Sequence, residues 1–141
     1  MTSSAPRSIP PTSLETSALR DALERHRTSL VARLEGGEDG VALGRANARF
    51  LNACFQLLFA DALRQAGLPN GVALAAVGSF GRGAVALHSD ADVVLIVDTQ
   101  IVGAKEAGAF VEALQPTFCL RLPEERYTHW REEYLDDVEM R

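Results

Sequence analysis

The sequence lacks the features that mark membrane-spanning, secreted and nucleic-acid-coating proteins. No run in its 141 residues approaches the ~20 apolar residues that a membrane span needs. The Ser/Thr/Pro-rich start, MTSSAPRSIPPTS, is not followed by the apolar core of a secretion signal. The net charge of −5 argues against a protein that coats nucleic acid, because phosphate binding normally requires a basic patch. We therefore expect a cytoplasmic protein with no membrane or nucleic-acid partner.

Cysteine and aromatic residues are also scarce. Cys54 and Cys119 stand alone, without the C-x-x-C or paired Cys/His spacing of a metal site, so we interpret both as small core residues. Aromatic residues make up only 6% of the chain, while apolar residues reach 47%, so a core must be built from Leu, Val and Ala. This length and composition suit one domain and not two.

The apolar pattern predicts a mixed fold of the α/β (α+β) class, with a small mixed β-sheet flanked by helices. Residues 1–13 are interpreted as a disordered lead and residues 14–141 as a single domain. Helices are expected at 14–34, 41–65, 103–115 and 123–141, and strands at 72–77, 93–97 and 117–122. The first two strands are continuous apolar runs, as expected of strands covered on both faces. His26, on the first helix, is expected at the surface.

The stretch VGSFGRGAVALHSDADVVLIVD, residues 77–98, carries the chemical signal of the sequence. Directly after a predicted strand, three glycines form G-x-x-G-x-G: Gly78, Gly81 and Gly83. This spacing is not the dinucleotide fingerprint, and Ala84 and Val85 stand where a P-loop requires Lys and Ser or Thr. Taken alone, the glycines also fit a tight connection between two strands.

Asp90 and Asp92 open the next predicted strand. At positions i and i+2 of an extended segment, their side chains point the same way. Two carboxylates that close repel each other, and burying them unpaired is costly. A divalent cation, Mg²⁺ or Mn²⁺, removes the conflict because it binds converging carboxylate oxygens. The alternative is an aspartate turn before a strand, supported by Ser89.

The joint pattern of strand, Gly-Ser, ten residues, Asp-x-Asp and strand resembles the signature of the DNA polymerase β nucleotidyltransferase superfamily. The longer form, GSFGRG followed by HSDADVVLIV, looks like the N-terminal nucleotidyltransferase domain of PII-uridylyltransferase-like proteins. The resemblance implies a nucleotidyltransferase fold and a Mg²⁺-dependent enzyme. Such an enzyme moves a nucleoside monophosphate from a nucleoside triphosphate (NTP) to a hydroxyl on a protein or small molecule.

By that resemblance, Asp90 and Asp92 are the catalytic residues and the metal ligands. Gly78 lets the backbone approach the triphosphate, and Ser79 donates its hydroxyl and N–H to a phosphate oxygen. Arg82 either pairs with a phosphate or braces the loop against Asp90. The full set of nucleotide-binding residues expected from the resemblance is Gly78, Ser79, Gly81, Arg82, Gly83 and Ser89.

The chain departs from the family pattern in two places. Relatives often carry an acidic residue after the GRG tripeptide, where this chain has Ala84. They also place a third carboxylate on a later strand, but the predicted strand 117–122 has no acid. Glu139 is either this third metal ligand or a solvated helix residue. Three alternatives therefore stay open: an incomplete domain that binds nucleotide or a partner without turnover, a component that works beside a helical partner domain or chain, and truncation at the C-terminus.

Overall fold

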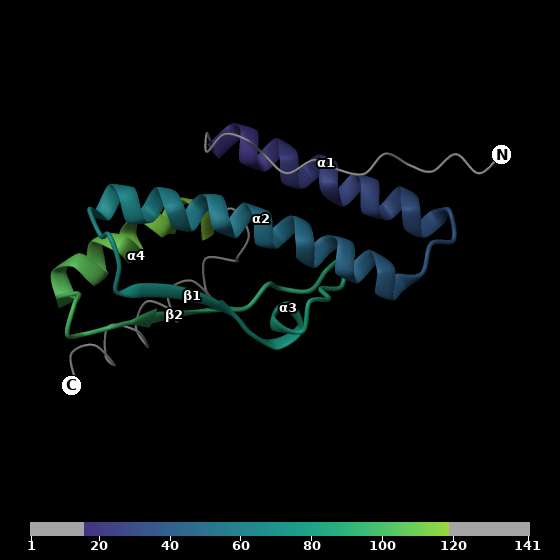
Figure 1. Cartoon of the computed structure of the whole chain (residues 1–141). Coiled ribbons are helices and arrows are strands. Elements are labelled where there is room, and N and C mark those ends of the chain that lie inside the picture. The colour runs from purple at the N-terminus through teal and green to yellow at the C-terminus, as the bar shows by residue number, and fades with distance from the viewer. Residues whose placement is uncertain (1–15, 119–141) are drawn as a thin grey trace. The chain divides into compact units, whose positions relative to one another are not determined.

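Two helices come first along residues 16–118, the part of the chain that this computed structural model describes, and strands and helices then alternate. The elements are α1 (Thr16–Glu35), α2 (Gly40–Ala66), β1 (Val72–Ala76), α3 (Gly78–Gly81), β2 (Val93–Val97) and α4 (Ala104–Phe118) (Figure 1). The two strands pair with each other. The N–H of Val77 donates to the C=O of Asp92 at 3.0 Å, and the N–H of Asp98 to the C=O of Gly71 at 2.8 Å, which is an antiparallel register. The fold is mixed α+β, as predicted.

The described residues form two compact units. The first unit comprises residues 16–57 and 74–94, and the second comprises residues 58–73 and 95–118. The boundary falls inside α2 and inside both strands. The glycines, serines and aspartates predicted as site residues between positions 78 and 92 all belong to the first unit.

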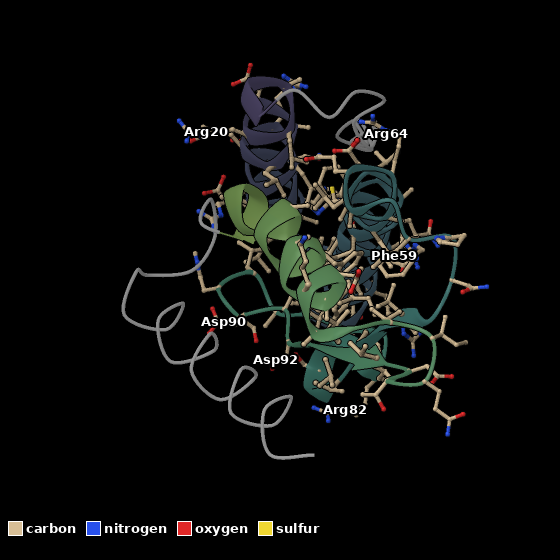
Figure 2. The ribbon with its side chains drawn as sticks, turned by 90° about the vertical axis from the view of Figure 1, so that its left-hand side faces the viewer. Arg20, Phe59, Arg64, Arg82, Asp90 and Asp92 are labelled. Atoms are coloured by element: carbon tan, nitrogen blue, oxygen red, sulfur yellow. The ribbon has the colours of Figure 1, made fainter. Side chains whose placement is uncertain are left out.

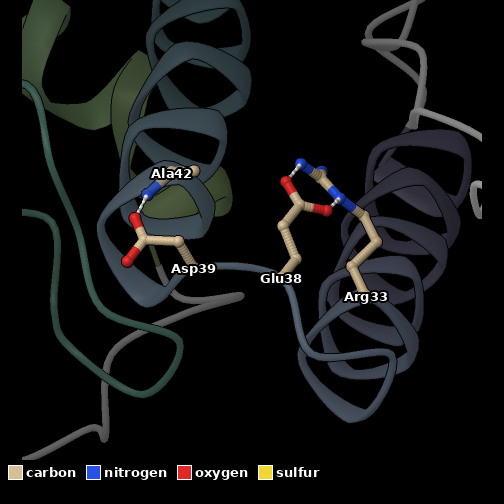
Figure 3. Close-up of polar contacts among 4 residues, drawn as sticks. All are labelled: Arg33, Glu38, Asp39 and Ala42. Atoms are coloured by element: carbon tan, nitrogen blue, oxygen red, sulfur yellow. Dashed lines mark hydrogen bonds and ion pairs between the residues drawn. The ribbon is translucent and has the colours of Figure 1, made fainter.

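The turn between α1 and α2 is built from local signals (Figure 3). Gly37 has φ +86°, and the N–H of Glu38 donates back to the C=O of Arg33 at 3.1 Å, which closes α1. The Arg33 guanidinium also donates two hydrogen bonds to the Glu38 carboxylate, at 2.6 and 2.7 Å, and these raise the pKa of Arg33. Asp39 caps α2 by accepting the N–H of Ala42 at 2.9 Å. The predicted helices 14–34 and 41–65 are confirmed to within two residues at each described end.

The core of the first unit lies along α1 and the first part of α2, which run alongside each other in Figure 1. Cys54 is buried there, as predicted, but the surface position predicted for His26 is wrong, because its side chain is only 3% exposed. The reason is helical periodicity, since buried positions of α1 recur every three or four residues: Leu19, Ala22, His26 and Leu30. The His26 ring stacks on Phe50 with centroids 3.8 Å apart and 5° between the planes.

Strand β2 is buried on one face. Val93 and Leu95 are buried, whereas Val94 and Ile96 are 37% and 55% exposed. The prediction that these strands are covered on both faces is therefore wrong for β2. A continuous apolar run shows that either face of a strand could be buried, but it does not show whether a second layer is present to cover it.

The second unit contains α4, which is longer than the predicted helix 103–115. Residues 117 and 118 are helical, so the predicted strand 117–122 is wrong at its start. The remainder of that strand, the predicted helix 123–141, Cys119 and the lead 1–13 lie outside the described residues. Phe110 of α4 is fully buried and meets Phe59 of α2 edge to face, with ring centroids 5.6 Å apart. Within residues 16–118, no helix has the length and apolar character that a bilayer crossing requires.

Candidate functional site: the glycine turn and the aspartate segment

The glycine-rich stretch after β1 forms a single helical turn, α3, so the expected loop is in part helical. Val77 is still extended, with φ −126° and ψ 178°, and Gly78 then takes φ +57°. The N–H of Gly81 donates to the C=O of Val77 at 2.8 Å, and the N–H of Arg82 to the C=O of Gly78 at 3.2 Å. The chain therefore turns within one residue of the strand, through a backbone conformation that favours glycine.

Two contacts fix α3 within the first unit. Phe80 is 6% exposed, and its ring lies 5.5 Å from that of Phe55 on α2. Gly81 lies against the end of β1, where an added Cβ would be 2.7 Å from the carbonyl oxygen of Ala76. Gly81 is thus required for close packing, whatever it contributes to a ligand. Ser79, on the same turn, is partly exposed.

Beyond the glycines, the chain is held to α2 at Val85, which has no exposed surface. Its N–H donates to the C=O of Gly44 at 3.0 Å, and its C=O accepts a hydrogen bond from Nδ2 of Asn47 at 3.1 Å. Neither Gly44 nor Asn47 is part of the motif that predicts the site. The available signal was a glycine and an asparagine at i and i+3 on the apolar face of a long helix.

At Asp92 the backbone lies beside the glycine turn again. Its C=O accepts the N–H of Val77 at 3.0 Å, so its backbone lies directly opposite the start of α3. Its exposed carboxylate lies against Gly78, because an added Cβ at Gly78 would be 3.1 Å from Oδ2 of Asp92. The structure therefore brings together the first glycine and the second aspartate of the sequence pattern.

The other predicted site residues lie on the same two segments of the first unit. Asp90 is partly buried, and Ser89 is exposed, with its hydroxyl 3.4 Å from the C=O of Asp90. Arg82 and Gly83 are exposed in the loop after α3, and Gly83 has φ +76°. Figure 2 shows Arg82 in that loop, and Asp90 and Asp92 on the segment that enters β2.

Two carboxylates of this segment could hold a metal ion. Among residues 16–118, no group of three or more His, Cys, Asp and Glu side chains could hold a metal ion by itself. Glu139, the weaker candidate ligand, lies outside the described residues. Mg²⁺ is usually bound by one or two carboxylates together with substrate phosphates and water, rather than by an all-protein cage. Asp90 and Asp92, two residues apart on one segment of the first unit, could act as such carboxylates.

One protein-family model matches the chain across both segments of the candidate site. The family model described as "Putative nucleotidyltransferase DUF294" matches residues 24–131, which include the glycine turn and the aspartate segment. No curated protein and no solved structure matches the chain significantly. The family match covers more than half of the 141 residues. The chain therefore belongs to the DUF294 family of nucleotidyltransferase-type domains.

Proposed function

We propose that this chain is a Mg²⁺-dependent enzyme that transfers a nucleoside monophosphate from an NTP to a hydroxyl on a protein or small molecule. The family match supports the transferase class. The observation that carries the proposal is the position of Asp92, whose carboxylate lies against Gly78 at the glycine-serine turn. A ligand that carries both phosphates and a divalent cation would bind both parts of this junction, with its phosphates at the glycine-serine turn and its cation at the carboxylate.

Each side of the junction has a distinct role in the proposal. Asp90 and Asp92 would hold Mg²⁺ or Mn²⁺, which when bound neutralises charge on the triphosphate and on the leaving pyrophosphate. The helical hydrogen bonds of α3 begin at Gly81, so the N–H groups of Gly78 and Ser79 have no partner within that turn. Those N–H groups and the Ser79 hydroxyl are donors for phosphate oxygens.

The proposed reaction is an in-line displacement at the α-phosphorus of the nucleotide. The acceptor hydroxyl oxygen forms a bond to that phosphorus and gives up its proton to solvent or to a base. The bond from the α-phosphorus to the bridging oxygen breaks, and pyrophosphate leaves with the electron pair. The resemblance to PII-uridylyltransferase-like domains makes UTP the first nucleotide to test and a protein hydroxyl the first acceptor.

A second candidate function is binding without turnover. It is favoured by one observation, that no third acidic ligand joins Asp90 and Asp92 within residues 16–118. In that case the chain binds nucleotide, or a helical partner domain or chain, and transfers nothing.

The two functions are separated by incubating the protein with each of four α-³²P-labelled NTPs, Mg²⁺ or Mn²⁺, and a cell lysate. We expect label in a protein or small molecule with the wild type, and none with Asp90→Asn or Asp92→Asn. Asp21→Asn, which removes one exposed negative charge from α1, is the matched control and should label as the wild type does. Nucleotide binding without labelled product would support the binding function. Labelling by Asp92→Asn at the wild-type rate would overturn the metal-ligand assignment.

A further inference from the structure

A buried network of hydrogen bonds connects α1, α2 and the segment that leads to Asp90 and Asp92. His26 and Asn47 are 3% and 6% exposed, and they are the buried polar residues among the described side chains of the chain. Nε2 of His26 lies 3.1 Å from Oδ1 of Asn47. Nδ2 of Asn47 donates to the C=O of Val85 at 3.1 Å and lies 3.5 Å from the C=O of Ala86. All four residues belong to the first unit.

The hydrogen bonds of this network all run in one direction, from His26 through Asn47 to the backbone of Val85. Because the amide nitrogen of Asn47 faces carbonyl oxygens, its oxygen is left to accept, and Nε2 of His26 must carry the proton. His26 is held in turn by its stack on Phe50. An asparagine that is bound on both sides in the interior has one orientation, since turning it would place donor against donor and acceptor against acceptor.

The segment that Asn47 binds is the one that carries the proposed metal ligands. Its first end is fixed at Val85, and its last end is fixed where the C=O of Asp92 accepts the N–H of Val77. Between them, the C=O of Ala86 accepts the N–H of Ser89 at 3.0 Å, one residue before Asp90. The path of the backbone through Asp90 therefore depends on the anchor at its first end.

We propose that Asn47 is a positioning residue for Asp90 and Asp92, and that His26 orients Asn47 for this role. The inference rests on the proposed function, because it treats the two aspartates as ligands of a nucleotide-borne cation. Asn47 acts through the backbone of residues 85–92 and does not touch the ligand. If the two residues were purely structural, replacing them would change only the stability of the fold. If they position the aspartates, replacing them also changes the affinity of the folded protein for the cation and nucleotide.

The first measurement needs no ligand. Hydrogen–deuterium exchange of the full chain is followed for the wild type, Asn47→Leu and Asn52→Leu at a temperature where all three are folded. Asn52 is exposed on the same helix and serves as the matched control. We expect amides of residues 85–92 to exchange about tenfold faster in Asn47→Leu. Local opening of this segment costs less free energy in the variant, because the hydrogen bond from Asn47 is already absent. Unchanged exchange in Asn47→Leu would overturn the proposal.

The second measurement is affinity. The ligand is Mn²⁺ with whichever of ATP, GTP, CTP and UTP most raises the wild-type melting temperature, and its dissociation constant is measured by calorimetry. We expect about tenfold weaker binding by Asn47→Leu and no change in Asn52→Leu. This is the low end of the ~10–100-fold loss seen when groups that directly bind a metal ligand are removed, because Asn47 acts on Asp90 and Asp92 only through the backbone. Equal affinities for the wild type and Asn47→Leu would overturn the proposal while leaving the proposed function intact.

A rescue pair covers the case in which Asn47→Leu does not fold. His26→Phe keeps an aromatic ring against Phe50 but removes the donor to Asn47, whereas His26→Gln restores an N–H donor of similar reach. We expect weaker Mn²⁺-nucleotide binding in His26→Phe and near wild-type binding in His26→Gln. If both bind as the wild type does, His26 does not orient Asn47 and the proposal fails. If the wild type itself binds no Mn²⁺ and nucleotide, the proposed function fails and the positioning role with it, and exchange at residues 85–92 then reports only a structural anchor.

Discussion

Gly78 meets two separate constraints at one position. Its φ of +57° lies in the region that side chains disfavour, and an added Cβ would be 3.1 Å from Oδ2 of Asp92. The first constraint concerns the fold, because any L-residue is strained there. The second concerns the candidate site, because relief of the contact requires the carboxylate to move.

Gly78→Ala should therefore lose more than stability. We expect the free energy of unfolding to fall by about 1–2 kcal/mol from the positive φ, and Mg²⁺ with nucleotide to stabilise the variant less than the wild type, because the Asp92 carboxylate must shift away from the added Cβ. Gly37→Ala is the matched control, since Gly37 has φ +86° with no atom within 4 Å of an added Cβ. It should lose similar stability and keep the full ligand effect. Urea unfolding with and without ligand measures both, and an equal ligand effect in the two variants would contradict the assignment.

Some residues of the site can be identified from a short stretch of sequence, whereas others depend on contacts between distant parts of the chain. Gly78, Ser79, Asp90 and Asp92 form a short motif, and the structure brings Gly78 and Asp92 together. His26 and Asn47 were missed because what distinguishes them is burial, which depends on the packing of two helices. A histidine among charged neighbours resembles a surface residue until its place in the helical period is compared with the buried positions around it.

At the scale of elements, α2 is the common support of the candidate site. Gly44 and Asn47 bind the backbone of Val85, and Phe55 packs on Phe80 of α3. Close approach at Gly44 is part of this support. An added Cβ there would lie 3.6 Å from the backbone nitrogen and oxygen of Val85 and 3.7 Å from Cβ of Ala84, which is ordinary contact.

This spacing predicts opposite outcomes for two substitutions at Gly44. Gly44→Ala should be neutral or stabilise α2 by up to about 1 kcal/mol, because alanine favours helix and its Cβ fits. Gly44→Val adds two methyl groups that must push Val85 away, and should destabilise by about 1–3 kcal/mol. Urea unfolding of both variants checks the sign. A valine variant as stable as the alanine variant would show that the loop is not closely packed on α2.

The last turns of α2 provide a pH-dependent test. The carboxylate of Asp61 accepts hydrogen bonds from Arg64 and Gln65, and the bond from Arg64 is the main cause that lowers the pKa of Asp61 below the usual 3.8. A lowered folded-state pKa gives stability that is present above the usual value and is lost as pH falls through the lowered one. Because the pair is near the surface, Asp61→Asn should cost no more than about 0.5 kcal/mol at pH 7. Urea midpoints of the two proteins should converge at the acid end, and a difference that persists there would contradict the ion-pair origin.

Element boundaries were predictable where the stop signal is local. Gly37 and Gly67 both take positive φ just after a helix, and Asp39 caps the next one. The burial of β2 was not predictable in the same way, since Val94 and Ile96 are as apolar as their buried neighbours. Whether the second face of a strand is covered depends on another layer, and periodicity carries no information about that layer.

For the whole molecule, the net charge of −5 sets the conditions for binding an anionic ligand. A triphosphate brings further negative charge to Asp90 and Asp92, so it needs a cation to bind there. Mg²⁺ and nucleotide together, at about 100 times the dissociation constant, should stabilise the fold by about 2.7 kcal/mol.

Excess EDTA should remove this stabilisation, and double-stranded DNA at 0.15 M salt should give none, because the chain offers no excess of positive charge to the phosphates. Thermal melting with each addition tests both expectations. Stabilisation by nucleotide in the presence of EDTA would show that binding does not require the cation.

The anchor at Val85 has a consequence for substitutions in this loop, because α2 holds the loop by its backbone. Gly44 binds an N–H and Asn47 a C=O, atoms that every residue except proline provides. Ala84, which is only partly buried, could therefore be replaced by a longer side chain while both hydrogen bonds at Val85 remain, whereas the Val85 side chain is fully buried and accepts little change.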